Sequence, residues 1–205
     1  MANELNRVEP PAIPLAPEQY DRPYQDQSNN VLRLFFNRLI GLVREIISTE
    51  DGGKFLYFPR GLFYSTTDQT AAVVNTGYPV EFENTYLGNG VSIVGDTEIT
   101  VSADGVYNFQ VTLQTAHTNS SDVQILTWIN KNGTDVPYGG QQQTIKGNAN
   151  QPVFWNFSID LTAGQYIEMY WSTGSTSLSL DSTAPASPHP GIPSTVVAVS
   201  FVSNL

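Results

Sequence analysis

Metal or acid–base chemistry that uses histidine would depend on two residues in this chain, His117 and His189. His117 stands beside the stretch TNSSD, and His189 stands between two prolines. A metal site needs three or four converging nitrogen, oxygen or sulfur ligands, and the sequence contains neither an HxH nor an HExxH spacing. It also lacks the GxSxG turn that carries the serine of many hydrolases. We therefore interpret both histidines as surface or turn residues, and we predict neither a metal site nor a cofactor.

The carboxylates are numerous but scattered. Glu81 and Glu83 fall on one face of a predicted strand, and Asp96 and Glu98 have the same spacing. A converging pair could serve glycoside hydrolysis, and such oxygens could bind calcium weakly. Because nothing else in the sequence supports either use, we predict solvated carboxylates, no catalytic residues and a non-enzymatic protein. A polysaccharide-degrading enzyme is the alternative, and it would require Glu81 or Glu83 for cleavage.

Aromatic side chains are the more informative group. Several of them lie in predicted strands, where they favour either a buried core or a subunit interface. A sugar-stacking site is the remaining alternative. We predict that the aromatic core or interface of the head contains Trp128, Trp155, Trp171, Tyr166 and Tyr170.

Short alternating strands must position these aromatic residues. The segment 105–114 alternates apolar and polar side chains, and segments 123–131 and 153–161 do the same before the turns NKNG and TAGQ. About eight such strands, separated by Gly, Asn and Pro, predict an antiparallel sandwich or jelly roll over residues 54–205. The fold class is therefore mainly β, with an extended N-terminal arm and one α-helix before the head.

The sequence predicts a helix over residues 29–49. Together with the glycine hinge that follows it, this trimerising helix forms the segment 29–53. Ser28 or Asn30 could cap its start. Apolar residues form two adjacent heptad seams, which make a wide face better suited to three strands than to two. The alternative is that the helix packs on its own β-domain. The predicted trimer interface is Leu32, Phe35, Phe36, Leu39, Ile40, Leu42, Val43, Ile46 and Ile47.

Residues 1–28 form a proline-rich arm. Proline fixes φ and keeps the preceding residue extended, so we predict an extended attachment segment rather than a helix. A plain flexible tail is the alternative. The residues predicted to attach the arm to a larger particle are Val8, Pro10, Pro11, Ile13, Leu15 and Tyr20.

Composition excludes several classes of partner. The 205 residues include 9 Lys and Arg against 19 Asp and Glu, a net charge of −10, which argues against nucleic acid. Cysteine is absent, so disulfides and thiolate metal sites are excluded. No secretory signal is recognised at the N-terminus, and no apolar window of about 18 residues predicts membrane insertion.

The strand sequences resemble two groups of proteins. SADGVYNFQVTLQ, WINKNGTDVPYG and WNFSIDLTAGQYIEMYWS are similar to the jelly rolls of tumour necrosis factors and complement globular heads, through Gly105, Tyr107 and Phe109 and through Leu161, Gly164, Tyr166 and Ile167. That resemblance implies trimers whose aromatic inner sheets pack around a three-fold axis.

A likeness over nearly the whole chain is to virion structural proteins of tailed phages, especially aquatic and cyanobacterial ones. It is carried by ANELNRVEPPAIPLAPEQYDRPYQDQSNNVLRLFFNRL and FPRGLFYSTTDQTAAVVNTGYPVEF. It implies a homotrimeric short fibre or spike in the virion, assembled in the host cytoplasm. Its arm would bind capsid or tail proteins, and its head would face a host-surface glycan or receptor. A capsid decoration (cement) protein that stabilises the shell is the alternative. A soluble ligand-like binding module, unrelated to virions, is another.

Overall fold

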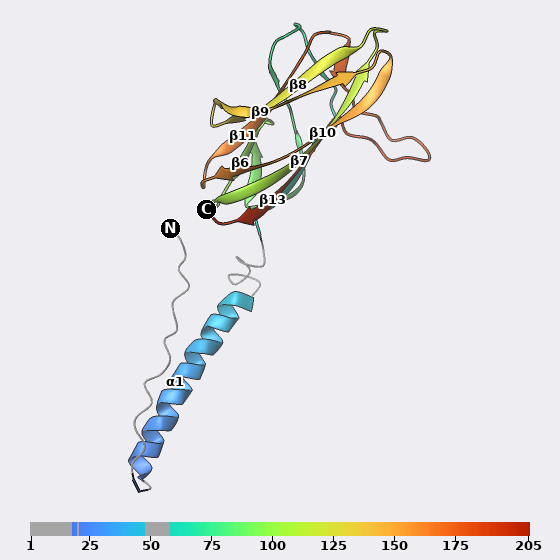
Figure 1. Ribbon diagram of the computed structural model, residues 1–205. Helices are drawn as coiled ribbons and strands as arrows, with labels where there is room; N and C mark the ends of the chain where they lie inside the picture. Colours follow the sequence, from blue (N-terminus) through green and yellow to red (C-terminus); the bar gives the residue numbers. More distant parts are fainter. Residues whose placement is uncertain (1–17, 20, 48–57) are drawn as a thin grey trace. The chain divides into compact units, whose positions relative to one another are not determined.

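The computed structural model describes residues 18, 19, 21–47 and 58–205 (Figure 1). The chain divides into two compact units, Met1–Tyr57 and Phe58–Leu205, which we describe separately. The six residues predicted to attach the arm all lie outside the described residues. Among the described residues, no helix is both long and apolar enough to cross a membrane.

The helix α1 spans Arg22–Ile47 and therefore begins earlier than the predicted residue 29. The carbonyl of Asp21 accepts the first helical hydrogen bond, from the amide of Gln25 at 3.1 Å, so Asp21 occupies the N-cap position. Pro23 lies in the first turn, where its missing N–H and fixed φ are tolerated. The expected caps Ser28 and Asn30 are thus inside the helix. We predicted that the prolines exclude a helix before residue 29. That prediction was wrong, because a helix tolerates a proline in its first turn.

The second unit is an antiparallel sandwich of two sheets, which confirms the predicted jelly-roll class. The first sheet has the central order β10–β7–β13–β1–β4, with β12 and β2 continuing beside the end of β7. The second sheet has the order β5–β6–β11–β8–β9, and β3 pairs with β11. Figure 1 shows β7, β10 and β13 in one layer and β8, β9 and β11 in the other.

The strands of the two sheets have the following bounds. The first sheet contains β1 (Arg60–Ser65), β2 (Gln69–Thr70), β4 (Asn84–Asn89), β7 (Gly105–His117), β10 (Ala149–Leu161), β12 (Leu178–Leu180) and β13 (Thr195–Ser203). The second sheet contains β3 (Tyr78–Pro79), β5 (Val91–Val94), β6 (Glu98–Val101), β8 (Val123–Lys131), β9 (Thr134–Ile145) and β11 (Tyr166–Thr173).

The core lies between the sheets and follows the predicted alternation. In β7, Tyr107, Phe109, Val111 and Leu113 are all buried. The alternation holds because successive side chains of a strand point to opposite faces. Fully burying a large apolar side chain contributes about 1.5–3 kcal/mol, so this shared interior is the main stabilising feature of the head.

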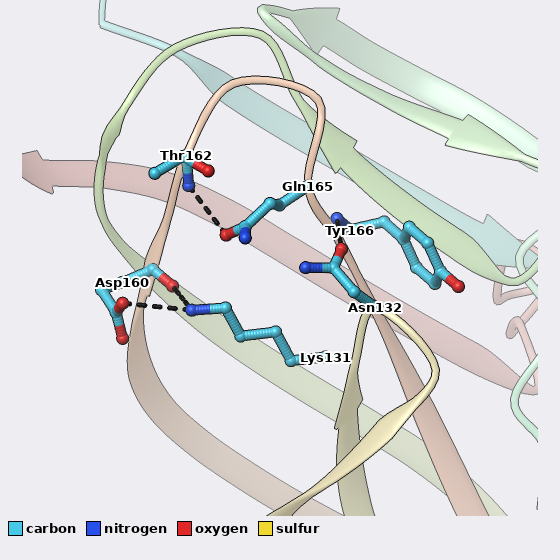
Figure 2. A network of polar contacts seen from close by, with 6 residues as sticks. All are labelled: Lys131, Asn132, Asp160, Thr162, Gln165 and Tyr166. Carbon is cyan, nitrogen blue, oxygen red and sulfur yellow. Dashed lines mark hydrogen bonds and ion pairs between the residues drawn. The ribbon is translucent and has the colours of Figure 1, made fainter.

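Polar contacts join the turns at one end of the sandwich (Figure 2). Lys131 Nζ donates to the carbonyl of Asp160 at 2.7 Å and to its Oδ2 at 3.1 Å, which links the second sheet to the first. Asn132 Oδ1 accepts from the amide of Tyr166 at 3.0 Å. Asn132 and Gly133 have φ values of 49° and 79°, as a tight two-residue hairpin requires. The turn predicted at NKNG is therefore present, between β8 and β9.

Candidate functional site

The two histidines occupy very different environments. His189 lies exposed in the loop between β12 and β13, with Nδ1 2.7 Å from the carbonyl oxygen of Pro190. His117 is only 3% exposed, so its interpretation as a surface or turn residue was wrong. It is the last residue of β7 and pairs with Ala149 of β10 on one side and Leu178 of β12 on the other. Both ring nitrogens are buried without a hydrogen-bond partner.

The predicted carboxylate pair does not form a catalytic arrangement. Glu81 and Glu83 lie between β3 and β4 rather than within a strand, although both remain exposed. Burial acts to raise the pKa of Glu83, but hydrogen bonds, including one from the Thr66 amide, outweigh it and lower that pKa. An ionised carboxylate held by hydrogen bonds is unsuited to the role of a general acid. Asp96 occupies the β5–β6 turn, while Glu98 starts β6.

No described group of three or more His, Cys, Asp or Glu residues is arranged to hold a metal ion. Three surfaces stand out: one side of α1, the outer face of the first sheet and the outer face of the second sheet.

The apolar side of α1 is exposed to solvent. Phe36 and Ile40 are more than half exposed, at 53% and 51%. Leu39 and Val43 are exposed to 37% and 42%, while Leu32, Phe35 and Leu42 are half-buried. The side chains of Ile46 and Ile47 lie outside the described side chains. At about 100° per residue, the nine predicted interface residues share an arc of about 160°. A contiguous exposed apolar surface of this kind is typical of an interaction site.

The outer face of the first sheet is nearly free of charge. Phe154 on β10 lies opposite Thr112 of β7, which also pairs with Val196 of β13, and Val196 pairs with Tyr64 of β1. Phe154 is 67% exposed. The neighbouring row runs through Asn156, Gln110, Ala198, Leu62 and Leu87.

Asp, Glu, Lys and Arg occur only twice in the strands of the same sheet, as Arg60 and Asp160. By contrast, residues 58–205 as a whole have 3 basic and 11 acidic residues, a net charge of −8. The first sheet therefore presents a neutral face of apolar and amide side chains on an acidic domain.

The five predicted aromatic residues separate into three environments. Trp171 lies in the core, with 1% exposure. Trp155 is half-buried on the inward side of the edge strand β10, with its ring 4.8 Å from that of Phe157. Trp128 and Tyr170 stack at 5.6 Å between ring centroids on the outer face of the second sheet, and Tyr166 lies on the same face. The sequence could not separate these environments, because strand pairing determines which ring has neighbours.

No protein-family model matches the sequence, and no curated protein matches it. Among solved structures, the chain is similar to the crystal structure of murine APRIL at pH 5.0, with 13% sequence identity and a TM-score of 0.47. That similarity covers 71% of this chain and 99% of the other.

Proposed function

We propose that the chain is a non-enzymatic structural protein of a phage virion, a homotrimeric short fibre or spike. Residues 1–28 anchor the protein to the particle, and the jelly-roll head faces outward toward the host surface. The observation that carries the proposal is the exposed apolar side of α1. A 26-residue helix with this much uncovered apolar surface is expected to pack against other helices.

The width of the apolar arc supports three helices rather than two. A two-stranded coiled coil buries a narrow seam, whereas α1 has two adjacent seams, with Leu39 on one and Phe36 and Ile40 on the other. Around a three-fold axis, each helix contacts two neighbours, so both seams are covered. Each large apolar side chain buried this way contributes about 1.5–3 kcal/mol before ordering costs.

The neutral face of the first sheet supports a second contact between heads. Phe154, Thr112, Val196 and Tyr64 form one row across it. The neighbouring row is also uncharged and consists of Asn156, Gln110, Ala198, Leu62 and Leu87. Such a surface avoids like-charge repulsion between identical subunits, which an acidic face would not. Contacts between copies in each unit would then both contribute to the stability of the trimer.

The resemblance of the arm and of residues 58–82 to phage virion proteins supports the proposal that the trimer belongs to a virion. The sequences LNRVEPPAIPLAPEQY and FPRGLFYSTTDQTAAVVNTGYPVEF carry that likeness. Among the described residues, His117 is buried without a hydrogen-bond partner, and Glu83 is held by hydrogen bonds. These features favour a structural role over a catalytic one.

Antibodies against the head provide a direct test on particles of the virus that encodes the chain. Electron microscopy should show label on tails or at discrete spikes, with label reduced when residues 1–17 are deleted. Label spread evenly over the capsid shell would favour the decoration protein instead. Absence of the chain from purified particles would contradict a virion role.

A further inference from the structure

A row of carboxylates crosses the outer face of the second sheet. Glu168 of β11 pairs with Asn130 of β8, and Asn130 pairs with Asp135 of β9. The β11–β6 register pairs Ile167 with Ile99, the residues next to Glu168 and Glu98. The hydroxyl of Thr97, which precedes Glu98, donates to Glu168 Oε1 at 3.0 Å, so Glu98 lies beside Glu168. We call Glu98, Glu168, Asn130 and Asp135 the acidic row. Neighbouring residues such as Ile99 and Ile167 are buried in the core, so the row faces outward.

The negative charge of the acidic row is not compensated by a cation among the described residues. The salt bridges there join other residues: Arg22 with Asp26, Lys131 with Asp160, and Lys146 with Asp122. Lys131 is the sequence neighbour of Asn130, yet it reaches Asp160 at the sandwich end (Figure 2). Like charges on facing positions of adjacent strands destabilise a sheet, so the arrangement calls for a positive partner.

Asn130 supplies an independent sign of a missing partner. It is 8% exposed, and its Nδ2 donates to Asp135 Oδ1 at 3.4 Å, so its side chain is directed into the row. Its Oδ1 is buried without any donor. A buried acceptor without a donor is unfavourable, and a donor entering between Glu168 and Asp135 would satisfy it.

Aromatic rings border the row on the same face. Tyr166 and Tyr170 lie two residues to either side of Glu168, and Tyr170 stacks on Trp128. Trp128 Nε1 donates to Asp135 Oδ1 at 3.1 Å, which fixes the indole beside that carboxylate. The pKa of Tyr166 is raised by burial and then by the charges of Glu98 and Glu168. The rings therefore sit in a negative potential that favours a cation.

We propose that this face recognises a guanidinium group, presented by an arginine side chain of a partner protein. The described residues offer no three-ligand metal site here, so a chelated ion does not fit the arrangement. A guanidinium has five donors in one plane, which suits acceptors spread over strands about 4.8 Å apart. It also stacks on aromatic rings, whereas a lysine ammonium is a compact point charge.

The proposal goes beyond the assembly proposed above and does not depend on it. The acidic row lies on the second sheet, whereas the neutral face considered for contacts between heads belongs to the first. A protein partner is favoured over a small ligand because the row is spread across the strands β6, β11, β8 and β9. An extended surface of this kind binds one arginine weakly and gains affinity from neighbouring contacts.

Calorimetric titration of the full-length chain with the end-blocked peptide Gly-Arg-Gly tests the proposal, with Gly-Lys-Gly and choline as matched cations. The arginine peptide should bind saturably, and the other two should bind more weakly. Glu168→Gln should weaken arginine binding by about tenfold, as expected for loss of a charge-assisted hydrogen-bonded pair. Asp181→Asn removes one charge beside β12 of the first sheet and should leave binding unchanged.

A second variant, Asn130→Leu, replaces the amide with an apolar side chain of similar volume and should also weaken binding. Its thermal midpoint shows whether the head remains folded. Three results would overturn the proposal. These are no binding to the unmodified chain, equal binding of the lysine peptide or choline, and equal weakening by Asp181→Asn. Light scattering on the same samples reports the oligomer separately, so failure of arginine binding is distinguishable from failure of the trimer.

Discussion

The carboxylate of Glu83 accepts hydrogen bonds from both the amide and the hydroxyl of Thr66, a residue in the turn after β1. Thr67 and Asn84 donate to the same oxygen at 3.3 and 3.1 Å. The contact ties the β1–β2 turn to the segment that leads into β4. It lowers the pKa of Glu83 from 4.5, so its contribution to stability depends on pH.

Glu83→Gln should reduce the free energy of unfolding at pH 7 by up to about 1 kcal/mol, since the site is exposed. The folded-state pKa is lowered, so this stability is present above about pH 4.5 and is lost as the pH falls through the folded value. The difference between the two proteins should therefore shrink below pH 4.5. Urea unfolding between pH 7 and pH 3 measures it. A difference that stays constant over this range would contradict the prediction, and Glu81→Gln controls for net charge.

Glu98→Gln should stabilise the head, because it removes one of two like charges on facing positions of β6 and β11. The expected gain is about 0.2–1 kcal/mol. Thermal unfolding at low and high salt measures it, and the gain should be larger at low salt because screening weakens the repulsion. A loss of stability would mean that Glu98 has a favourable contact in the folded head.

Gly147→Ala should destabilise the head by about 1–3 kcal/mol, the cost of forcing extra volume into a packed site. A Cβ at residue 147 would overlap the backbone carbonyl of Ser120, and backbone cannot rotate away. Gly174→Ala is the matched control, because its nearest contact is a Val123 methyl at 3.9 Å. Denaturant midpoints compare the two variants. Equal midpoints would show that the 118–122 turn can move to accept the methyl group.

Phe154→Asp should weaken association between heads, since it places a charge on the neutral face of the first sheet. Leu126→Asp changes a residue that is 42% exposed on the second sheet and should leave association unchanged. Sedimentation of the full-length chain over a dilution series measures the effect, expected to be about tenfold or more in the dissociation constant. Dissociation by Leu126→Asp alone would place the contact on the other sheet.

The fold class was predictable because alternation in single strands is a local property. Tyr107, Phe109 and Leu113 identify their own buried face wherever β7 is placed. The start of α1 was missed because Pro23 was treated as excluding helix, although a first turn accepts it. The burial of His117 was missed because it depends on β12, which pairs with it from residue 178.

The acidic row was not predictable for a related reason. Glu98, Asn130, Asp135 and Glu168 are separated by up to 70 residues in the sequence and meet only through the registers of four strands. A shift of one residue in any register would turn that side chain into the core. By contrast, the apolar side of α1 can be recognised from the sequence, because its residues belong to one continuous segment. The sequence does not identify the partners that cover this side.

The mass of the full-length chain in solution, measured by light scattering at low concentration, tests the helix-clamped trimer most directly. The unmodified chain should have three times the 22.5 kDa mass of one chain. Leu39→Asp should release monomers, because a carboxylate would be buried between helices. Leu34→Asp should remain trimeric, because Leu34 is also exposed, at 51%, but lies about 160° from the middle of the apolar arc. A monomeric unmodified chain, or a trimer that survives Leu39→Asp, would contradict the proposed clamp.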